Sequence, residues 1–544
     1  MRWWGWGEDG HDVALPEHAL AMLRSELGLD ADAGARPVAL EDVRLPDSRL
    51  DASVRARLAA VVGEQHVLDD RAARVGHAAG RSYPDLVRLR TGELAGAPDA
   101  VVVPGSTEQV QAVLAICAEA RVAVVPFGGG TSVVGGVDPF ADGFPAVISL
   151  DLHRLNRLLG VDRTSLTATF EGGLFGPEAE RLLEAEGVTL GHFPQSFEYS
   201  TVGGWVATRS AGQASTGHGR IDELVEGLRL VAPSGELAPR ALPATAAGPD
   251  LRELLVGSEG VLGVICEATL RVRELPTARH YEGWSFRSFE EGCEALRVME
   301  QADGAPDVVR LSDEHETRLS LALASTGSTT ERAGRAYLRM RGHEGGCIAI
   351  AGFEGERDDV ERRRVHSGAL LRAGGGLRLG RRPGEAWLRG RYAGPYLRDA
   401  LLDHGAFVET LETATSWSNL PTLYAAVGHA LRVSLSERGT PPLVMCHVSH
   451  LYRSGASLYY TFLARQQPEA AIDQWQAAKS AACDAILANG GTITHHHAIG
   501  RDHAAWMPAE IGAVGIDLIR AAKQRLDPVG IMNPGKLLLA VDGR

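Results

Sequence analysis

The chain contains few lysines and carries a net negative charge. Lysine occurs only at Lys479, Lys523 and Lys536, so arginine supplies almost all of the positive charge. The net charge of −14 argues against a nucleic-acid partner, because proteins that bind nucleic acids present a basic face. An anionic ligand would therefore have to be bound by local arginines.

Cysteines are few, and a long apolar run is missing. The six cysteines include no CxxC pair, so neither a zinc site nor a disulfide framework is indicated, and we predict no metal site. The N-terminus, MRWWGWGEDG, lacks the features of a signal peptide, and no stretch approaches the roughly 20 apolar residues of a spanning helix. We expect a cytoplasmic protein. Contact with the inner face of a membrane and a homodimer both stay open.

The length of 544 residues and the 44% hydrophobic content predict two or more lobes. From Ala100 the pattern predicts a strand, a helix capped by Ser106 and a second strand, which together form a βαβ unit. Strands are then expected in AVISLDL and SLTATFEGG, followed by a helix from Pro177 to Glu186.

These patterns divide the chain into four predicted segments. They are a helical region at 1–94, a cofactor-binding α+β domain at 95–276, a substrate domain at 277–485 and a C-terminal segment at 486–544 that returns to the site. The Gly- and Arg-rich stretch from Gly374 to Gly384 predicts a mobile loop or lid hinge. The last 50 residues or so predict a helix followed by a loop and a terminal strand.

A glycine-rich loop, PFGGGTS at 126–132, closes a valine-rich strand. Glycine reaches positive φ without a Cβ clash, so the backbone N–H groups of 128–132 can converge on one anion, most simply a pyrophosphate. An ordinary hairpin turn is the alternative interpretation. A Rossmann or P-loop mode is excluded, because neither GxGxxG after a strand nor GxxxxGK[ST] occurs.

Together with PQSFEYSTVGGWVATRSAG (194–212) and GSEGVLGVI (257–265), this loop resembles the flavin-binding domain of the vanillyl-alcohol oxidase flavoprotein superfamily. The resemblance implies non-covalently bound FAD in a two-lobed α+β fold, with an FAD-binding domain and a cap domain of antiparallel sheet and helices. Glycine turns suit this cofactor because they let the backbone approach a flat ring. The residues implied to bind FAD are Pro126, Phe127, Gly128, Gly129, Gly130, Thr131, Ser132, Pro194, Ser200, Thr201, Gly203, Gly204, Arg209, Ser210, Gly257, Glu259, Gly260, Gly263 and Ile265.

Within that superfamily, the chain is most similar to the alkyldihydroxyacetonephosphate synthase family. The similarity runs almost end to end, through RWWGWG (2–7), VVRLSDEHE (308–316), PYLRDALLDHG (395–405), SHLYRSGASLYYTF (449–462) and ITHHHAIGRDHAAWM (493–507). It implies an FAD-dependent transferase of ether lipid synthesis, which exchanges the acyl chain of acyl-dihydroxyacetone phosphate for a long-chain alcohol without net redox change.

The C-terminal DPVGIMNPGKLL instead resembles the ending of hydroxy-acid oxidases in the same superfamily. The alternative function is therefore an FAD-linked oxidase or dehydrogenase of a 2-hydroxy acid or alcohol.

The exchange requires a proton to be taken from a substrate carbon and later returned. The resemblance assigns this role to Tyr459, with Tyr460 as a register alternative, and a half-buried strand position is the structural alternative. His495, His496 and His497 follow TIT, an expected strand end, and strand alternation would send His496 to the opposite side from the other two.

Imidazoles titrate near neutrality, so the three histidines are predicted to orient Tyr459, share its proton or contact phosphate. A solvated loop and a metal site completed by Asp502 and His503 are the alternatives.

Two arginines match the family. A guanidinium fork binds phosphate in a bidentate manner, so Arg398 is the candidate for the substrate phosphate, and Arg310 is expected to support the flavin ring or the wall of the site. The alternative for each is an ion pair with a neighbour, Asp399 or Asp313. Finally, Trp3, Trp4 and Trp6 favour either a membrane interface or packing against the flavin domain.

Overall fold

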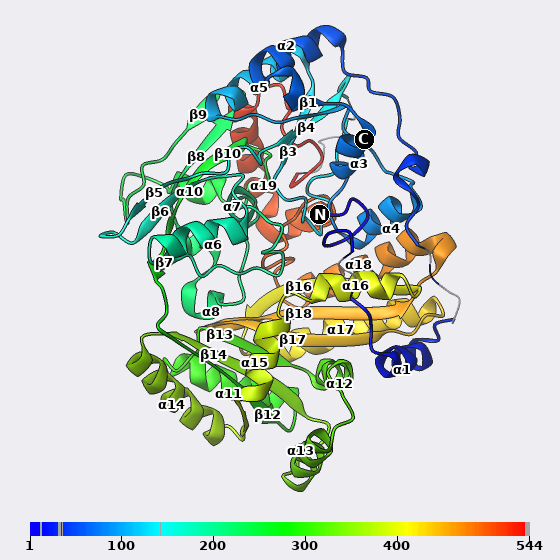
Figure 1. The fold of residues 1–544 in the computed structure, drawn as a ribbon, viewed down its shortest axis with the longest axis vertical. Coiled ribbons are helices and arrows are strands. Elements are labelled where there is room, and N and C mark those ends of the chain that lie inside the picture. The colour runs from blue at the N-terminus through cyan, green and yellow to red at the C-terminus, as the bar shows by residue number, and fades with distance from the viewer. Residues whose placement is uncertain (11–12, 31–33, 35, 142, 539–544) are drawn as a thin grey trace.

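The computed structural model describes residues 1–544 except 11–12, 31–33, 35, 142 and 539–544. The chain forms two lobes, and Figure 1 shows the first above the second. The N-terminal helices are divided between the lobes: α1 packs on the second, beside α12, whereas α2 packs in the first, against α5. Their bounds are α1 (Glu17–Leu27), α2 (Ala52–Val62), α3 (Arg71–Gly76), α4 (Tyr83–Thr91), α5 (Thr107–Ala120) and α12 (Glu314–Leu323).

One sheet of the first lobe has, among the described residues, the strand order β1-β2-β4-β3. Strands β2 and β3 each pair with β4 in parallel, and α5 connects them, so the predicted βαβ unit is confirmed with β4 inserted between its strands. The Ser106 hydroxyl accepts from the Gln109 N–H at 3.3 Å and caps α5. The strands are β1 (Val67–Leu68), β2 (Ala100–Val102), β3 (Ala123–Phe127) and β4 (Val147–Asp151).

A second sheet of this lobe is antiparallel, with the order β5-β6-β10-β8-β9 over the described part of the chain. The apolar faces of α6 and α7 pack on it, around Phe170, Val206 and Leu230. The elements are β5 (Leu158–Asp162), β6 (Thr167–Glu171), α6 (Gly176–Ala185), β7 (Val188–Thr189), α7 (Val202–Thr208), α8 (Ser215–His218), α9 (Ile221–Leu224), β8 (Val225–Ala232), β9 (Gly235–Leu237), α10 (Leu251–Leu255), β10 (Val264–Arg271) and β11 (Arg273–Glu274).

The second lobe is built on an antiparallel sheet with the described order β15-β12-β14-β13-β17-β18-β16. Alternate strand residues such as Leu411, Tyr460 and Phe462 pack with α17 and α18 in the main core. The strands are β12 (Ala278–Phe286), β13 (Val308–Ser312), β14 (Cys347–Gly355), β15 (Leu377–Gly380), β16 (Ala406–Ser416), β17 (Leu443–Tyr452) and β18 (Gly455–Arg465). The intervening residues of β16, β17 and β18 face the opposite side of the sheet, where the candidate site lies.

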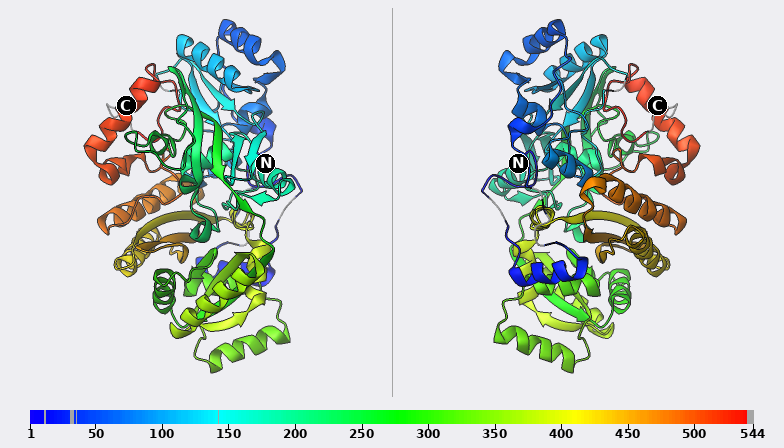
Figure 2. Two further views of the ribbon diagram at one scale, coloured as in Figure 1. Left: turned by 90° about the vertical axis from the view of Figure 1, so that its left-hand side faces the viewer. Right: turned by 90° about the vertical axis from the view of Figure 1, so that its right-hand side faces the viewer.

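The remaining helices are α11 (Phe289–Gln301), α13 (Thr329–Met340), α14 (Arg357–Ala373), α15 (Arg381–Gly390), α16 (Gly394–Leu402), α17 (Leu420–Glu437), α18 (Ala471–Ala488) and α19 (Met507–Leu526). Figure 2 shows α19, in red, along the flank of the first lobe. The two-lobed α+β fold with an antiparallel sheet in the second lobe is therefore confirmed. None of the helices in the described part of the chain combines the length and apolar character needed to span a bilayer.

Two local predictions are wrong. Residues 377–384 are not a loop but the strand β15 and the start of α15, because β15 pairs with β12. The chain after α19 forms only an isolated parallel bridge between Met532 and Val124, not the expected terminal strand.

Candidate active site

The glycine loop packs too tightly for side chains. A Cβ on Gly129 would lie 1.6 Å from the Tyr199 carbonyl oxygen, and one on Gly128 would lie 2.4 Å from the Thr201 hydroxyl. Gly260, at φ +74°, in turn faces the Pro126 ring, which a Cβ would approach to 2.9 Å. The three motifs, distant in sequence, therefore meet at the end of β3.

Five consecutive backbone N–H groups in this loop are left without an internal partner. Within the described residues, the N–H groups of 128–132 donate no hydrogen bond to another protein group. Convergent free amides with no side chains among them are the arrangement that a diphosphate requires. The loop therefore fits the pyrophosphate of FAD.

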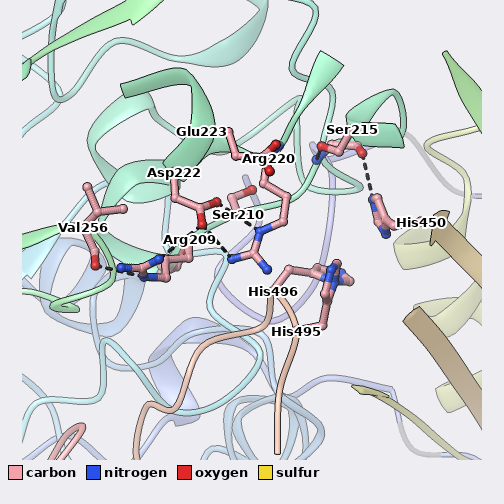
Figure 3. Close-up of polar contacts among 12 residues, drawn as sticks. Arg209, Ser210, Ser215, Arg220, Asp222, Glu223, Val256, His450, His495 and His496 are labelled. Atoms are coloured by element: carbon pink, nitrogen blue, oxygen red, sulfur yellow. Dashed lines mark hydrogen bonds and ion pairs between the residues drawn. The ribbon is translucent and has the colours of Figure 1, made fainter. Parts of the chain in front are cut away.

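Several other residues predicted to bind FAD use their side chains to hold the fold. The Ser200 hydroxyl accepts from Trp205 Nε1 at 2.7 Å, and Thr201 caps α7 by accepting from the Gly204 N–H at 3.3 Å. Arg209 pairs with Asp222 and Glu253 and donates to the Val256 carbonyl oxygen (Figure 3). Only the backbone of these positions is left to contact a cofactor.

Glu259 connects the first lobe to the C-terminal segment. Its carboxylate accepts from the N–H groups of Ile499 at 2.8 Å and Gly500 at 2.6 Å. Burial raises the pKa of Glu259 to about 7, although these two hydrogen bonds oppose the shift. Glu259 thus holds the segment that follows the histidine triplet.

The other predicted cofactor positions surround the same loops. Ser210 lies 3.2 Å from His192 Nε2, and a Cβ on Gly203 would meet the Gly172 carbonyl oxygen at 2.7 Å. Gly257 and Gly263 have positive φ, and Ile265 lies in β10. Pro194 begins the turn that precedes Tyr199, since its carbonyl accepts from the Phe197 N–H.

Tyr459 lies on the face of the second-lobe sheet that is turned away from α17. Its ring stacks on His447 with centroids 4.9 Å apart and on His496 at 6.0 Å, and it meets His497 edge-on at 5.4 Å. Burial raises the pKa of Tyr459 to about 12, so its hydroxyl is protonated near neutrality.

Tyr460 points the other way. It is completely buried in the core, where its hydroxyl contacts backbone carbonyl oxygens of α17. Of the two register alternatives, only Tyr459 therefore faces the imidazoles.

A single carboxylate organises the histidine triplet. Glu412 of β16 accepts from the backbone N–H groups of His495, His496 and His497 at 2.5, 3.1 and 2.7 Å and from the Thr494 hydroxyl at 2.6 Å. Burial opposes the ionisation of Glu412, but the three histidines and Thr494 outweigh it and hold the pKa well below its usual range.

The expected strand alternation of the triplet is wrong, because these three N–H groups turn toward one carboxylate and the segment is not a strand. His495 and His496 share a contact between their Nδ1 atoms at 3.0 Å. All three rings thus belong to one cluster, in which burial lowers each histidine pKa.

Arg310 acts through an acidic neighbour that differs from the expected one. It forms an ion pair with Glu316, whose other oxygen lies 3.1 Å from His447 Nδ1. Burial opposes the ionisation of Glu316, but Arg310 and His447 lower its pKa to about 2. Asp313, the predicted partner, instead caps α12. Arg310 is thus linked to the ring that stacks on Tyr459.

Arg398 is linked to the glycine loop rather than to the imidazoles. On α16, its Nη1 donates to the Arg81 carbonyl oxygen at 2.7 Å, and its Nε lies 3.4 Å from Asp399, the predicted neighbour. The Arg81 N–H in turn donates to the Ser132 carbonyl oxygen at 2.6 Å. Asp399 also accepts from the Trp6 N–H, and Trp6 is buried edge-on against Tyr199.

Sequence reasoning missed several residues of the cluster. Strand alternation around Tyr459 could have indicated His447, but Glu412, Glu316 and Arg220 carried no local signal. The missed His450, on β17, bonds through Nε2 to the Gly212 carbonyl oxygen at 2.9 Å and through Nδ1 to the Ser457 hydroxyl at 3.2 Å.

The ring nitrogens of His450, His495 and His496 lie within 4.8 Å of one another, whereas the predicted metal partners Asp502 and His503 do not join them among the described residues. Since both nitrogens of His450 already have partners, this group fits a hydrogen-bonded network.

Comparison with known proteins agrees with this geometry. Residues 98–238 match the family described as FAD binding domain, and residues 275–537 match FAD linked oxidases, C-terminal domain. Alkyldihydroxyacetonephosphate synthase of Dictyostelium discoideum is 36% identical over 86% of this chain and 78% of its own length. The Trypanosoma brucei brucei protein of the same name is 33% identical over 99% of this chain and 92% of its own.

The chain belongs to the alkyldihydroxyacetonephosphate synthase family. A solved structure of alkyldihydroxyacetonephosphate synthase superposes with a TM-score of 0.85 at 30% identity, covering 98% of both chains. An FAD-dependent enzyme of the alkyldihydroxyacetonephosphate synthase family is thereby confirmed, and the alternative of a hydroxy-acid oxidase is less supported.

Proposed function

We propose that the chain replaces the acyl group of acyl-dihydroxyacetone phosphate by a long-chain alcohol, with no net redox change. The observation that carries the proposal is the position of Tyr459, which lies between the His447 and His496 rings on the side of the sheet that faces the first lobe. Bound FAD supplies an electron-poor ring that activates the substrate carbon, and the protein must move the proton of that carbon.

Tyr459 and the imidazoles divide the proton transfer between them. At neutral pH the Tyr459 hydroxyl holds its proton, because its pKa is raised to about 12. It can therefore accept a substrate proton only as it passes its own to a base. The neighbouring imidazoles are neutral, since burial lowers the pKa values of His496 and His497, and a neutral ring can accept that proton.

Arg398 is proposed to bind the substrate phosphate. Its guanidinium carries five N–H donors, and the contacts at the Arg81 carbonyl oxygen and at Asp399 leave capacity for an anion. Arg310 is proposed to support the wall of the site by fixing Glu316 and thereby His447.

Two assays test the reaction. Purified holoprotein mixed with palmitoyl-dihydroxyacetone phosphate and hexadecanol is expected to release palmitate and form the ether product. Palmitate release without ether would count against the proposal. Steady anaerobic bleaching of the flavin by D-lactate or glycolate would support the oxidase instead.

The lipid substrates also motivate peripheral membrane contact. Trp6 is buried against Tyr199, and Trp4 lies under the guanidinium groups of Arg2 and Arg90, so the proposal depends on Trp3 and the outer face of Trp4. Liposome flotation with and without residues 1–7 tests it. A homodimer is proposed with it, and sedimentation equilibrium tests this assembly.

A further inference from the structure

A chain of polar contacts enters the histidine cluster from the first lobe. It starts at Arg220, which precedes α9 and points toward His495 and His496 in Figure 3. Nε and Nη2 of Arg220 bind the Asp222 carboxylate at 3.0 and 3.2 Å, and the guanidinium also forms a hydrogen bond with the Tyr452 hydroxyl. Asp222 thus holds the guanidinium in one orientation.

The chain continues through Tyr452, at the end of β17. The Tyr452 hydroxyl lies 2.5 Å from His495 Nε2, and His495 Nδ1 lies 3.0 Å from His496 Nδ1. The order of contacts is therefore Arg220, Tyr452, His495 and His496, and it crosses from one lobe to the other.

The direction of these hydrogen bonds follows from the chemistry of the first residue. A guanidinium has donors and no acceptor, so Arg220 must donate to the Tyr452 oxygen. Among the residues that the structure describes, His495 Nε2 is the remaining acceptor at the Tyr452 hydroxyl, which therefore donates to it. The opposite direction would leave the Tyr452 proton without an acceptor, and an unmade hydrogen bond is costly in a half-buried site.

The two histidines then have defined tautomers. Since His495 Nε2 accepts, its Nδ1 carries the proton and donates to His496 Nδ1. His496 in turn must carry its own proton on Nε2. Both rings are neutral, because burial and the nearby positive charge of Arg220 lower their pKa values.

We propose that Arg220 and Tyr452 are positioning residues that fix His496 as the Nε2–H tautomer, so that this imidazole beside Tyr459 donates a hydrogen bond to a substrate oxygen. The catalytic part of this inference rests on the proposed function, whereas the tautomer is a property of the protein itself. His496 stacks on Tyr459, so a fixed tautomer leaves a donor next to the residue that moves the proton.

The test combines a spectroscopic and a kinetic measurement on holoprotein. Solid-state ¹⁵N spectra of protein labelled in its histidine rings distinguish protonated from unprotonated nitrogens. His495→Gln and His496→Gln assign the two rings. We expect Nδ1–H for His495 and Nε2–H for His496 in the unaltered chain.

Tyr452→Phe removes the donor to His495. We expect a mixture of tautomers at both rings and a fall in kcat of about tenfold with little change in KM or in flavin absorbance. Arg220→Leu should have the same effect, and Arg220→Lys, which keeps a donor-only head group, should restore part of the tautomer preference.

The matched control is Tyr281→Phe. Its hydroxyl donates to Glu354 at 2.7 Å in another part of the second lobe, so the same chemical change should alter neither the ring signals nor kcat. The proposal is overturned if His496 carries its proton on Nδ1, if Tyr452→Phe leaves both rings unchanged, or if the tautomers change while kcat does not. Failure of the proposed reaction would show separately, as an unaltered chain with the expected tautomers that forms no ether product.

Discussion

Glu412 and Tyr459 are directly opposite residues on the neighbouring strands β16 and β18. Opposite residues of an antiparallel pair project from the same face, so the strand register places the carboxylate that shapes the histidine segment beside the tyrosine. His447 lies opposite Tyr459 on the other side, in β17. One row of three strand residues therefore supports the proposed proton transfer.

Replacing Tyr459 by Phe should remove the proton carrier and leave the fold intact. We expect a fall of about 100-fold or more in the rate of ether formation, measured from labelled hexadecanol, while the protein stays yellow. Tyr460→Phe is the control, because its hydroxyl lies in the core and its loss should affect stability rather than rate. Ether formation at the normal rate by Tyr459→Phe would remove this residue from the mechanism.

Glu412→Gln should disturb the histidine segment. The amide presents one carbonyl oxygen and an NH₂ group where the carboxylate now accepts three backbone N–H groups. We expect a loss of about 1–3 kcal/mol in the free energy of unfolding and a 10- to 100-fold fall in kcat, measured by denaturant titration and the ether assay. Glu180→Gln, which alters a buried carboxylate of the first lobe, should lose stability but keep kcat. Equal kcat losses in both variants would contradict the role of Glu412.

Glu259 should make stability depend on pH. Its pKa is raised to about 7 in the folded chain, against about 4.3 when unfolded, so the folded state binds more protons between these values. Stability should therefore fall as the pH rises from about 4 to 7. Glu259→Gln cannot ionise, and its Tm should be lower than that of the unaltered chain at pH 5 by a larger margin than at pH 8. A margin that widens with pH would show the sign to be wrong.

Gly129→Ala should prevent FAD binding. The added Cβ would lie 1.6 Å from the Tyr199 carbonyl oxygen, so the loop must move and its free N–H groups must lose their convergence. We expect a folded protein without flavin absorbance. Gly334→Ala is the control, because the space around this residue of α13 is open. A yellow Gly129→Ala protein would contradict the assignment of the loop to the pyrophosphate.

Much of the fold and part of the candidate site could be predicted from the sequence. The glycine loop, the βαβ unit and the motif around Tyr459 are local, since their residue types and spacing already limit the backbone. The stretch from Gly374 to Gly384 failed because its strand depends on pairing with β12, almost 100 residues earlier.

The sequence by itself determined which groups are present: free amides for an anion, a tyrosine in a strand, three adjacent imidazoles and arginines for charge. Only the tertiary structure decided their relations. Glu412 bends the histidine segment, Glu316 connects Arg310 to His447, and Arg398 lies beside the glycine loop. These partners come from separate strands and helices, so a hydrogen bond or an ion pair between them exists only after the sheet register and the packing of the two lobes bring them within reach.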